Sequence, residues 1–338
     1  MSSRPIPVRR ALAAAARLAP ATRTLGWLTT WLMTATMGAL ALSQAIGITG
    51  SPTIYVVHSL TPYLLAPAAP LAALAALGRH HLLALTNAMI LLALMVLTGP
   101  VVFDGGAPLA PPDAATVRVA HANAYYMNDT PRAAAATLLG LGVDVIAVTE
   151  YDDELADAFD ALGVDDRYAF RIDQSSPSPG GVALFSRYPI VEGSVERIGR
   201  QYGIEAIIDV NGSLLRVMVV HPFPGADETA LADLNNDLRV FAARAASPGP
   251  PTMLVGDFNA SRWHPQFREL LGTGLADAHE ALGKGFSRSW PTGAELPRFV
   301  RLDHALLDDR VIPVQVNDIV VPGSDHLGFV VEVAILNR

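Results

Sequence analysis

Two long stretches near the N-terminus contain no charged side chain. Neither residues 24–78 nor residues 82–103 include an Asp, Glu, Lys or Arg. About 20 apolar residues cover the roughly 30 Å hydrocarbon core of a bilayer, and soluble helices need a polar face that these stretches lack. The pattern therefore predicts three transmembrane helices, at 25–48, 54–77 and 82–102. Three prolines predict a kink in the second helix, namely Pro62, Pro67 and Pro70.

Beyond residue 116, short apolar runs alternate with segments of helical spacing. The predicted strands are 117–122, 143–149, 182–186, 204–210, 214–221, 253–255, 301–307, 311–316 and 329–335. The predicted helices are 132–141, 154–161, 229–246 and 265–271. Asn211-Gly212 between two strands is a strong hairpin signal, so at least that pair is antiparallel. Mixed strands and helices of this kind predict an α/β sandwich, with two sheets inside and helices outside.

Basic residues predict the orientation in the membrane. The first predicted span follows five arginines, Arg4, Arg9, Arg10, Arg17 and Arg23, and Arg79 separates the second span from the third. The segments on the other side carry no Lys or Arg. The positive-inside bias then places the N-terminus in the cytoplasm and the rest of the chain outside, in what the Arg-rich and Ala-rich composition suggests is a bacterial plasma membrane.

These patterns divide the chain into four segments. Residues 1–24 form a basic cytoplasmic N-terminus, and residues 25–103 form the three transmembrane helices. Residues 104–116, rich in Pro and Gly, read as a linker. Residues 117–338 are long enough for one well-cored domain, which we expect to be catalytic.

The net charge limits the partners of that domain. From Asp113 onward there are 18 Lys and Arg against 31 Asp and Glu, a balance of −13. Such a surface does not attract nucleic acid at long range. Cysteine is absent, which excludes disulfides and thiol chemistry. The sequence also lacks a Walker loop, a dinucleotide glycine fingerprint and HExxH.

Polar side chains gather where the predicted strands end. Residues 252–255 run into Gly256-Asp257-Phe258-Asn259, and residues 319–322 precede Ser324-Asp325-His326. Strand ends present side chains to ligand crevices. Other apolar runs lead to Asn123, Glu150, His221 and Asp303. Carboxylates, carboxamides and imidazoles together suit a hard divalent cation and phosphoryl chemistry.

In this order, these motifs closely resemble the endonuclease/exonuclease/phosphatase superfamily. That superfamily includes DNase-like nucleases, abasic-site endonucleases, sphingomyelinases and inositol-phosphate phosphatases. The resemblance spans the domain after the linker and none of the apolar part, and it implies a DNase-like sandwich that hydrolyses phosphoesters with Mg²⁺ or Mn²⁺. Relatives usually carry an aromatic residue before the first-strand Asn. Here that residue is Ala122, so Asn128 competes with Asn123 for the role.

The resemblance also implies a role for each site residue. Asp257 would orient or deprotonate the attacking water, and Asn259 would donate to a phosphate oxygen. His326 would stabilise charge on the phosphorane, with Asp303 holding its ring, and His221 would donate to a non-bridging or leaving-group oxygen. The implied metal set is Glu150, Asn123 and Asp325. We expect substrate contacts in the loops after site strands, from Arg262, Trp263, Arg288 and Trp290. We interpret three other histidines, His264, His279 and His304, as packing or surface residues.

The leading hypothesis is a membrane-anchored phosphodiesterase acting outside the cytoplasm on a lipid headgroup or a small phosphodiester. An extracellular nuclease is the alternative, because the fold often serves that function, although the charge does not favour it. A rival of another class is an inactive scaffold that keeps the fold and binds a ligand. The expected partners are the phosphoester substrate and the bilayer, and no protein partner is evident.

Overall fold

The structure, a computed structural model, describes residues 7–103, 106–293 and 296–336. The chain divides into two compact units. One consists of Met1–Ile46 and Thr61–Leu97, and the other of Gly47–Leu60 and Thr98–Arg338. The second unit holds both sheets, together with a short segment that lies between the apolar helices in the sequence.

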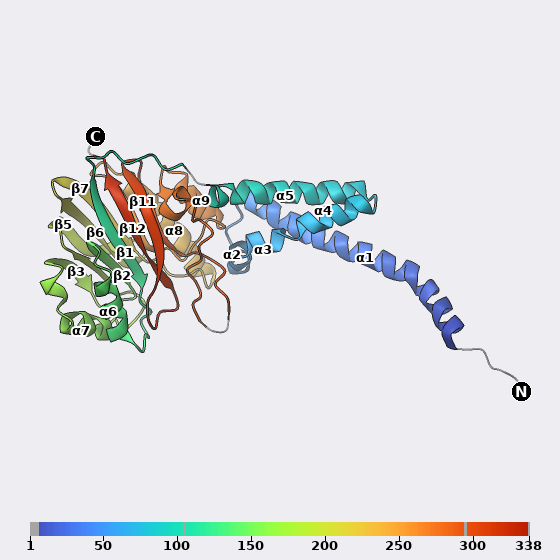
Figure 1. The fold of residues 1–338 in the computed structure, drawn as a ribbon, viewed down its shortest axis with the longest axis horizontal. Coiled ribbons are helices and arrows are strands. Elements are labelled where there is room, and N and C mark those ends of the chain that lie inside the picture. Colours follow the sequence, from blue (N-terminus) through green and yellow to red (C-terminus); the bar gives the residue numbers. More distant parts are fainter. Residues whose placement is uncertain (1–6, 104–105, 294–295, 337–338) are drawn as a thin grey trace, which may run out of the picture. The chain divides into compact units, whose positions relative to one another are not determined.

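Two six-stranded mixed sheets form the centre of the second unit (Figure 1). The first has the order β11 (Val311–Val320), β12 (Leu327–Ile335), β1 (Ala115–Asn123), β2 (Val145–Thr149), β4 (Val182–Ser186) and β3 (Phe170–Gln174). The second has the order β5 (Ile190–Ile198), β6 (Gln201–Val210), β7 (Ser213–Val220), β8 (Thr252–Asp257), β10 (Asp303–Leu307) and β9 (Ala276–Asp277). Pairs β1–β2 and β7–β8 are parallel, and the other described pairs are antiparallel.

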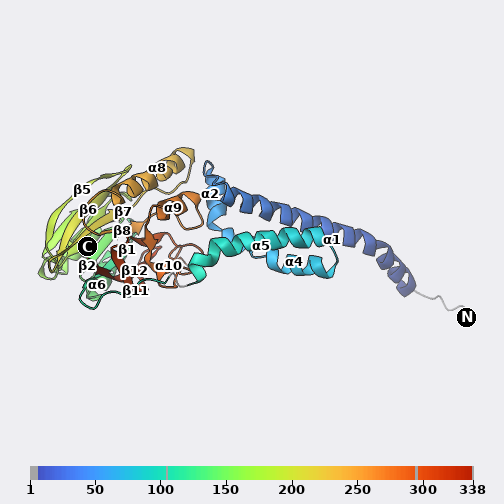
Figure 2. The same cartoon turned by 90° about the horizontal axis from the view of Figure 1, so that it is seen from above.

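Helices lie outside the sheets, as Figure 2 shows for α8 (Glu228–Ala245) above the second sheet. The other helices that follow β1 in the chain are α6 (Pro131–Gly140), α7 (Asp153–Ala161), η1 (Val164–Asp166), α9 (Pro265–Leu271) and α10 (Ala278–Ala281). Asp152 and Asp227 cap α7 and α8 by accepting main-chain N–H bonds with their side chains. The predicted α/β sandwich is confirmed.

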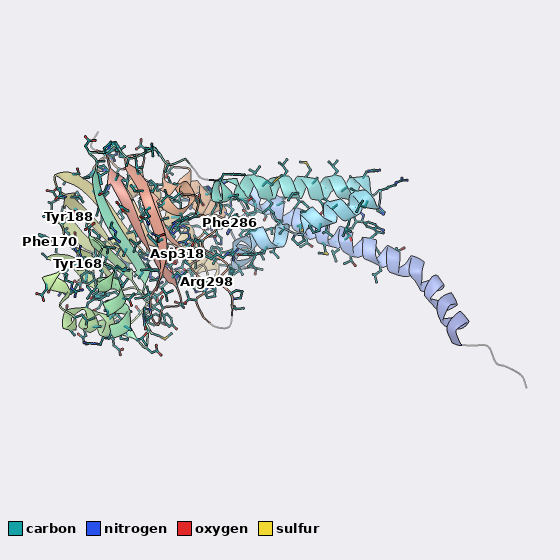
Figure 3. The ribbon with its side chains drawn as sticks, viewed as in Figure 1. Tyr168, Phe170, Tyr188, Phe286, Arg298 and Asp318 are labelled. Carbon is teal, nitrogen blue, oxygen red and sulfur yellow. The ribbon has the colours of Figure 1, made fainter. Side chains whose placement is uncertain are left out.

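The period of two along a strand divides the core into layers. Val119 of β1 and Val255 of β8 belong to the apolar cluster shared by the two sheets. Their neighbours Ala120 and Leu254 point the other way, into the clusters beneath α6–α7 and α8–α9 respectively. Tyr168, labelled in Figure 3, is fully buried in the α6–α7 layer, where its hydroxyl donates to the Val143 carbonyl at 3.0 Å.

The hairpin prediction is confirmed, whereas several edge strands escaped prediction. Asn211 and Gly212 both have positive φ, and Val210 pairs with Ser213. Strands β3, β5 and β9 lie towards sheet edges, where half-exposed, charged residues give no continuous apolar run. Strand β10 begins at Asp303, two residues later than the sequence pattern indicates.

The apolar helices match the predicted spans in part. Residues Thr24–Ala45 of α1 (Pro7–Ala45) and all of α5 (His81–Val102) are long and apolar enough to cross a membrane. The predicted middle span is instead divided into α2 (Pro52–Ser59), α3 (Thr61–Leu65) and α4 (Ala68–Leu77). A sharp bend separates α2 from α3 at a one-residue break. Proline explains such breaks, because it lacks an N–H and restricts the preceding residue.

Polar pairs join the apolar helices of the first unit. The Asn87 amide of α5 donates to the Thr34 hydroxyl of α1 at 2.8 Å, and the Gln44 amide donates to the Thr61 hydroxyl at 2.6 Å. All four residues are buried. Hydrogen bonds between helices are a common source of association in lipid, so these pairs suit a helical hairpin in a membrane. Residues 104–105 of the predicted linker and Arg4 lie outside the described residues.

Candidate active site

The directions of the strands bring the predicted polar residues to one edge of the sandwich. The parallel strands β1 and β2 end at Asn123 and just before Glu150, and the parallel strands β7 and β8 end just before His221 and at Asp257. Strand β10 runs antiparallel to β8, so its first residue, Asp303, pairs with Asp257. His326 likewise precedes β12, which is antiparallel to β1. Four carboxyl ends and two amino ends therefore meet.

The carboxamide of Asn123 connects two carboxylates. Its Nδ2 donates to Glu150 Oε1 at 2.9 Å and to Asp257 Oδ2 at 3.0 Å. Its oxygen accepts the Tyr125 N–H at 3.0 Å. Asn123 is fully buried, so the amide fixes the separation of Glu150 and Asp257 with both of its polar atoms engaged in three hydrogen bonds.

The other candidate asparagine, Asn128, binds loop atoms rather than the carboxylates. Its amide donates to the carbonyls of Ala124 and Pro322, and its oxygen accepts the N–H and hydroxyl of Thr130. These bonds tie the loop after β1 to the loop before His326. Of the two asparagines, Asn123 is the one that contacts the carboxylates, and Asn128 supports a turn.

The Gly256-Asp257-Phe258-Asn259 segment owes its glycine to close strand packing. A Cβ at Gly256 would lie 1.9 Å from the carbonyl oxygen of Val220 on β7. The Asp257 carboxylate then accepts the Asn259 N–H at 2.8 Å, and Asn259 Nδ2 donates to the Pro222 carbonyl at 2.9 Å. Phe258 is fully buried among aromatic rings. The glycine allows the approach, and the polar residues stiffen the turn that follows.

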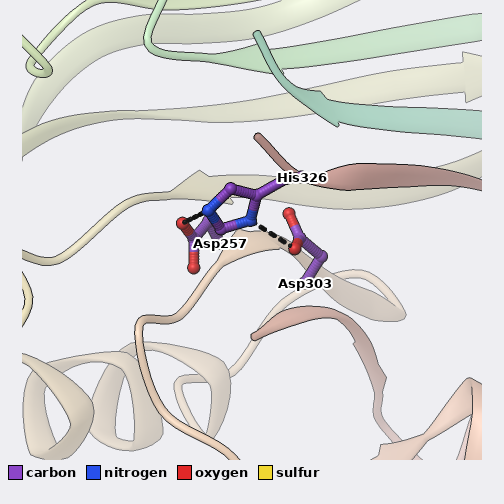
Figure 4. Close-up of side chains that lie close together, drawn as sticks. All are labelled: Asp257, Asp303 and His326. Carbon is purple, nitrogen blue, oxygen red and sulfur yellow. Dashed lines mark hydrogen bonds and ion pairs between the residues drawn. The ribbon is translucent and has the colours of Figure 1, made fainter. Parts of the chain in front are cut away.

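Asp257, His326 and Asp303 form a buried chain of acid, imidazole and acid (Figure 4). His326 Nδ1 lies 2.8 Å from Asp303 Oδ2, and its Nε2 lies 3.6 Å from Asp257 Oδ2. Burial alone would lower the pKa of His326, but the charges of Asp303 and Asp257 outweigh it and raise the pKa well above the ordinary range. Burial opposes ionisation of Asp303 too, yet His326 lowers the pKa of that carboxyl to about 2. The pair is therefore an imidazolium–carboxylate at neutral pH.

A second imidazole flanks Asp303 on the other side. His121 Nδ1 lies 3.5 Å from Asp303 Oδ1, and its Nε2 lies 3.4 Å from the Thr149 hydroxyl. Burial lowers the pKa of His121 to about 4. Of the two rings beside Asp303, His326 carries the charge and His121 is neutral.

The His221 ring faces the two carboxylates that Asn123 connects. Its Nδ1 lies 3.0 Å from the Pro179 carbonyl, which requires a hydrogen on Nδ1. Its Nε2 lies 3.6 Å from Glu150 Oε1 and 3.8 Å from Asp257 Oδ2. The ring therefore points its other nitrogen at the place where anionic oxygen atoms gather.

The last predicted ligand, Asp325, belongs to the loop before β12. Its Oδ2 accepts the indole N–H of Trp290 at 3.2 Å. The adjacent Ser324 hydroxyl donates to the Asn123 carbonyl at 2.7 Å and accepts the His326 N–H at 2.9 Å. The Ser324-Asp325-His326 loop is thus fastened directly to the end of β1.

A cavity of about 470 Å³ opens onto these groups. Its polar wall consists of Glu150, His221, Asp257, Asn259, Asp325 and His326. The remaining lining is mainly apolar and comes from the loop after β7, the loop before β10 and helix α2. One cavity is therefore open to the carboxylates and to the imidazolium together.

A family model described as "Endonuclease/Exonuclease/phosphatase family" matches residues 117–326. The chain belongs to this family. The family resemblance drawn from the motifs is confirmed.

Solved structures of the family share the fold. D. rerio TDP2 humanized by 14 mutations has a TM-score of 0.55 and 17% identity, covering 65% of this chain and 99% of that one. D. rerio TDP2 complexed with single-strand DNA product has a TM-score of 0.55 and 18% identity, over 64% and 98%. A family protein from Leptotrichia buccalis has a TM-score of 0.50 and 16% identity, over 65% and 100%. No curated protein sequence matches the chain. At these identities the likeness shows the fold alone.

The donor set fits the divalent metal on which this family depends. Ligand-type atoms of Asp257, Asp303 and His326 lie within 4.8 Å of one another, but a protonated His326 ring has no lone pair to offer, so the carboxylates would hold the cation. Each oxygen of Glu150 accepts one described hydrogen bond, from Asn123 or from the Tyr126 N–H, and has a second lone pair to offer. Hard carboxylate oxygens with surplus negative charge suit such a cation.

Three of the four predicted substrate contacts do not line the cavity. Arg262 pairs with Glu280 at 2.6 Å, and Trp263 is buried. Arg288 lines a separate hollow beside Arg298 and Phe286, which are labelled in Figure 3. Only Trp290 of the four reaches the cavity, in contact with Asp325. Proximity in sequence to a site strand does not fix which way a loop side chain points, so substrate contact by Arg262, Trp263 and Arg288 stays a prediction.

Sequence reasoning also missed residues at the site. His121 is two positions before Asn123 on β1, so alternation along the strand placed both on one face and was an available signal. Tyr55 and Ser59 of α2 were assigned to a membrane span. Their partners, Asn259 and His264, lie more than 200 residues away in the sequence, so no local signal marked them. His264, His279 and His304 are all buried, so they are packing residues and not surface residues.

Proposed function

We propose that the protein is a membrane-anchored phosphodiesterase that uses Mg²⁺ or Mn²⁺ and acts outside the cytoplasm. The observation that carries the proposal is the buried Asp257–His326–Asp303 chain beside the Glu150–Asn123–Asp257 bridge. An inactive scaffold has no need for an imidazolium held between two acids in an open cavity. Family membership supports phosphoester hydrolysis, and the apolar helices support the anchor.

In the proposed reaction, water attacks the phosphorus of a phosphodiester and the ester oxygen leaves. Asp257 accepts the proton of the water, and that proton ends on the leaving alcohol, so the products are a phosphomonoester and an alcohol. His326, charged and held by Asp303, donates from Nε2 to a phosphate oxygen as negative charge builds there. A divalent cation held by Glu150, with Asn123 and Asp325 beside it, would draw charge from the phosphate oxygens.

Two further residues position the substrate. His221 Nε2 faces the same space as Glu150 and Asp257, where it can bind a non-bridging or leaving-group oxygen. Asn259 uses one amide N–H for Pro222, which leaves its second N–H for a phosphate oxygen.

Hydrolysis of bis-p-nitrophenyl phosphate by the full chain in detergent tests this proposal. We expect turnover with Mg²⁺ that EDTA abolishes, and Asp257→Ala should lower kcat by about 10²-fold or more, the scale of general-base loss. Asp309→Ala, an exposed acid after β10, serves as the matched control and should keep full activity. If neither this diester nor any phosphomonoester shows metal-dependent turnover, the inactive scaffold becomes the better description.

A nuclease is the second candidate, because D. rerio TDP2 was solved with a single-strand DNA product. Nucleic-acid binding requires cations that neutralise phosphates, and its affinity falls steeply with salt. No Lys or Arg is among the described residues that line the cavity. Plasmid and single-stranded DNA assayed beside phospholipid vesicles, at two salt concentrations, separate the two candidates. Efficient, salt-sensitive DNA cleavage without lipid turnover would favour the nuclease.

A further inference from the structure

Helix α2 packs against the sandwich directly beside the Gly256-Asp257-Phe258-Asn259 segment. The Tyr55 hydroxyl donates to the main-chain carbonyl of Asn259. The Tyr55 ring stacks on the ring of His264, with centroids 4.1 Å apart and planes 21° apart. Both residues belong to the compact unit that contains the sheets. Although α2 lies between apolar helices in the sequence, its contacts are with the catalytic unit.

His264 also holds α2, through polar contacts with Tyr55 and Ser59. Its Nδ1 accepts the Ser261 N–H at 2.9 Å, so the hydrogen-bond network assigns the ring hydrogen to Nε2. Nε2 then lies 3.0 Å from the Tyr55 carbonyl and 3.1 Å from the Ser59 hydroxyl. His264 is fully buried and burial lowers the pKa of its ring to about 3, so the ring is neutral. Buried polar bonds therefore hold α2 in one position.

In that position α2 forms a wall of the active-site cavity. Tyr55, Val56 and Ser59 line the same cavity as Asp257 and His326. Val56 is 58% exposed although it lines the cavity, which places it at the rim. The cavity is also lined by apolar side chains outside α2, which include Phe223, Pro224, Trp290, Phe299, Val300 and Leu302.

We propose that α2 and these apolar loops form a subsite for the hydrocarbon part of a lipid phosphodiester, with Val56 as a specificity-determining residue. The proposal rests on the phosphodiesterase function proposed above and names its substrate class. A polar phosphate meets the acids and imidazoles, and the apolar lining gains only from an apolar substituent. A sugar–phosphate chain would leave that lining wet and would find no Lys or Arg among the described lining residues to neutralise its further phosphates.

The position of α2 in the chain favours a lipid over a soluble amphiphile. One residue, Leu60, separates α2 from the apolar stretch Thr61–Leu77, and six residues separate it from the candidate span Thr24–Ala45. The cavity wall is therefore continuous with segments that we propose to lie in the bilayer. Such a tether keeps lipid headgroups at high effective concentration near the site.

Two p-nitrophenyl esters with the same leaving group test the subsite. Methyl and octyl p-nitrophenyl phosphate differ only in the alkyl chain, and the full chain is assayed with Mg²⁺ in a non-ionic detergent. Each buried methylene is worth about fourfold in binding, so three buried methylenes should favour the octyl ester by about 60-fold in kcat/KM. Val56→Asp should reduce this octyl-to-methyl ratio by at least about tenfold, because it places a charge at the rim of an apolar site.

Val191→Asp is the matched control, since Val191 is 56% exposed on β5 and does not line the cavity. It should leave the octyl-to-methyl ratio at the wild-type value, and Val56→Ile should retain the preference. Partition of the octyl ester into detergent is the same for every variant and cancels in the comparison. Equal wild-type kcat/KM for the two esters, or an unchanged ratio in Val56→Asp, would overturn the subsite and leave the phosphodiesterase intact. Failure to hydrolyse either ester would instead count against the phosphodiesterase itself.

Discussion

Replacement of Asp303 by asparagine isolates the charge that holds His326 protonated. The carboxamide has the shape of the carboxylate, and its oxygen can still accept the His326 Nδ1–H that lies 2.8 Å from Asp303 Oδ2. What disappears is a negative charge in a fully buried place. That charge raises the pKa of His326, so its removal lowers the pKa of the ring.

The size of the effect follows from the geometry. Two unit charges about 4 Å apart interact by about 4 kcal/mol at an effective dielectric constant of about 20. Since about 1.4 kcal/mol corresponds to a tenfold change in protonation, the alkaline limb of kcat/KM should move down by about two to three pH units. The imidazolium is the active form in our mechanism. Activity should therefore stay within about tenfold of wild type near pH 6 and fall by about 10²-fold near pH 9.

The assay is the pH profile of diester hydrolysis between pH 6 and pH 9, with Mg²⁺ saturating at each pH. Asp308→Asn is the control, because Asp308 follows the opposite end of the same strand, where it binds the Thr252 N–H and Arg310. Its profile should match wild type. If Asp303→Asn lost the same factor at every pH, Asp303 would act only through structure, and an unchanged profile would remove the imidazolium from the mechanism.

Two further predictions concern the metal and the topology. Glu150→Gln should raise the Mg²⁺ concentration for half-maximal activity by roughly a hundredfold, because it removes a charged oxygen ligand; Glu154→Gln on the exposed side of α7 should change nothing, and equal Mg²⁺ dependence in both variants would exclude Glu150 as the anchor. A reporter active only outside the cytoplasm should be active when fused after Arg338 and inactive when fused at Arg79, and the reverse pattern would place the active site in the cytoplasm.

The parts of the site that lie at strand ends were predictable from the sequence. Asp257 and His326 follow or precede apolar runs, and strands of a sandwich must end at one of two edges. To predict that Asp303 pairs with Asp257, one must also know that β10 runs antiparallel to β8. The sequence pattern contains apolar periodicity but no strand order, so the motif resemblance supplied that step.

Helix α2 was not predictable from hydropathy, because its residues satisfy two environments. Ile54, Val56 and Val57 suit lipid as well as an apolar cavity wall. Tyr55 and Ser59 carry no charge, so they also fit the interfacial end of a membrane span. What distinguishes the environments is the partner of each polar atom. The Tyr55 hydroxyl has its partner on Asn259, 204 residues away in the sequence. A contact of that range has no local signal.

Backbone strain gathers where the acids meet, which bears on how the site is kept in order. Glu150, Asn259 and Tyr125 have φ of 54°, 47° and 62°, a left-handed conformation that costs an L-residue about 1–3 kcal/mol. Each is held by a bond within the site. The Tyr125 N–H binds the Asn123 oxygen, the Glu150 carboxylate accepts the Tyr126 N–H, and the Asn259 N–H binds Asp257.

These bonds make the strained turns and the polar constellation depend on each other. Asn123 orients Glu150 and Asp257, and their carboxylates in turn fix the loops that carry Tyr126 and Asn259. The Asn259 carbonyl also accepts the Tyr55 hydroxyl. This hydrogen bond joins α2, the proposed specificity wall, to the turn that follows the proposed base, Asp257. The geometry of the acids is therefore set by the fold itself, which is the arrangement that electrostatic preorganisation requires.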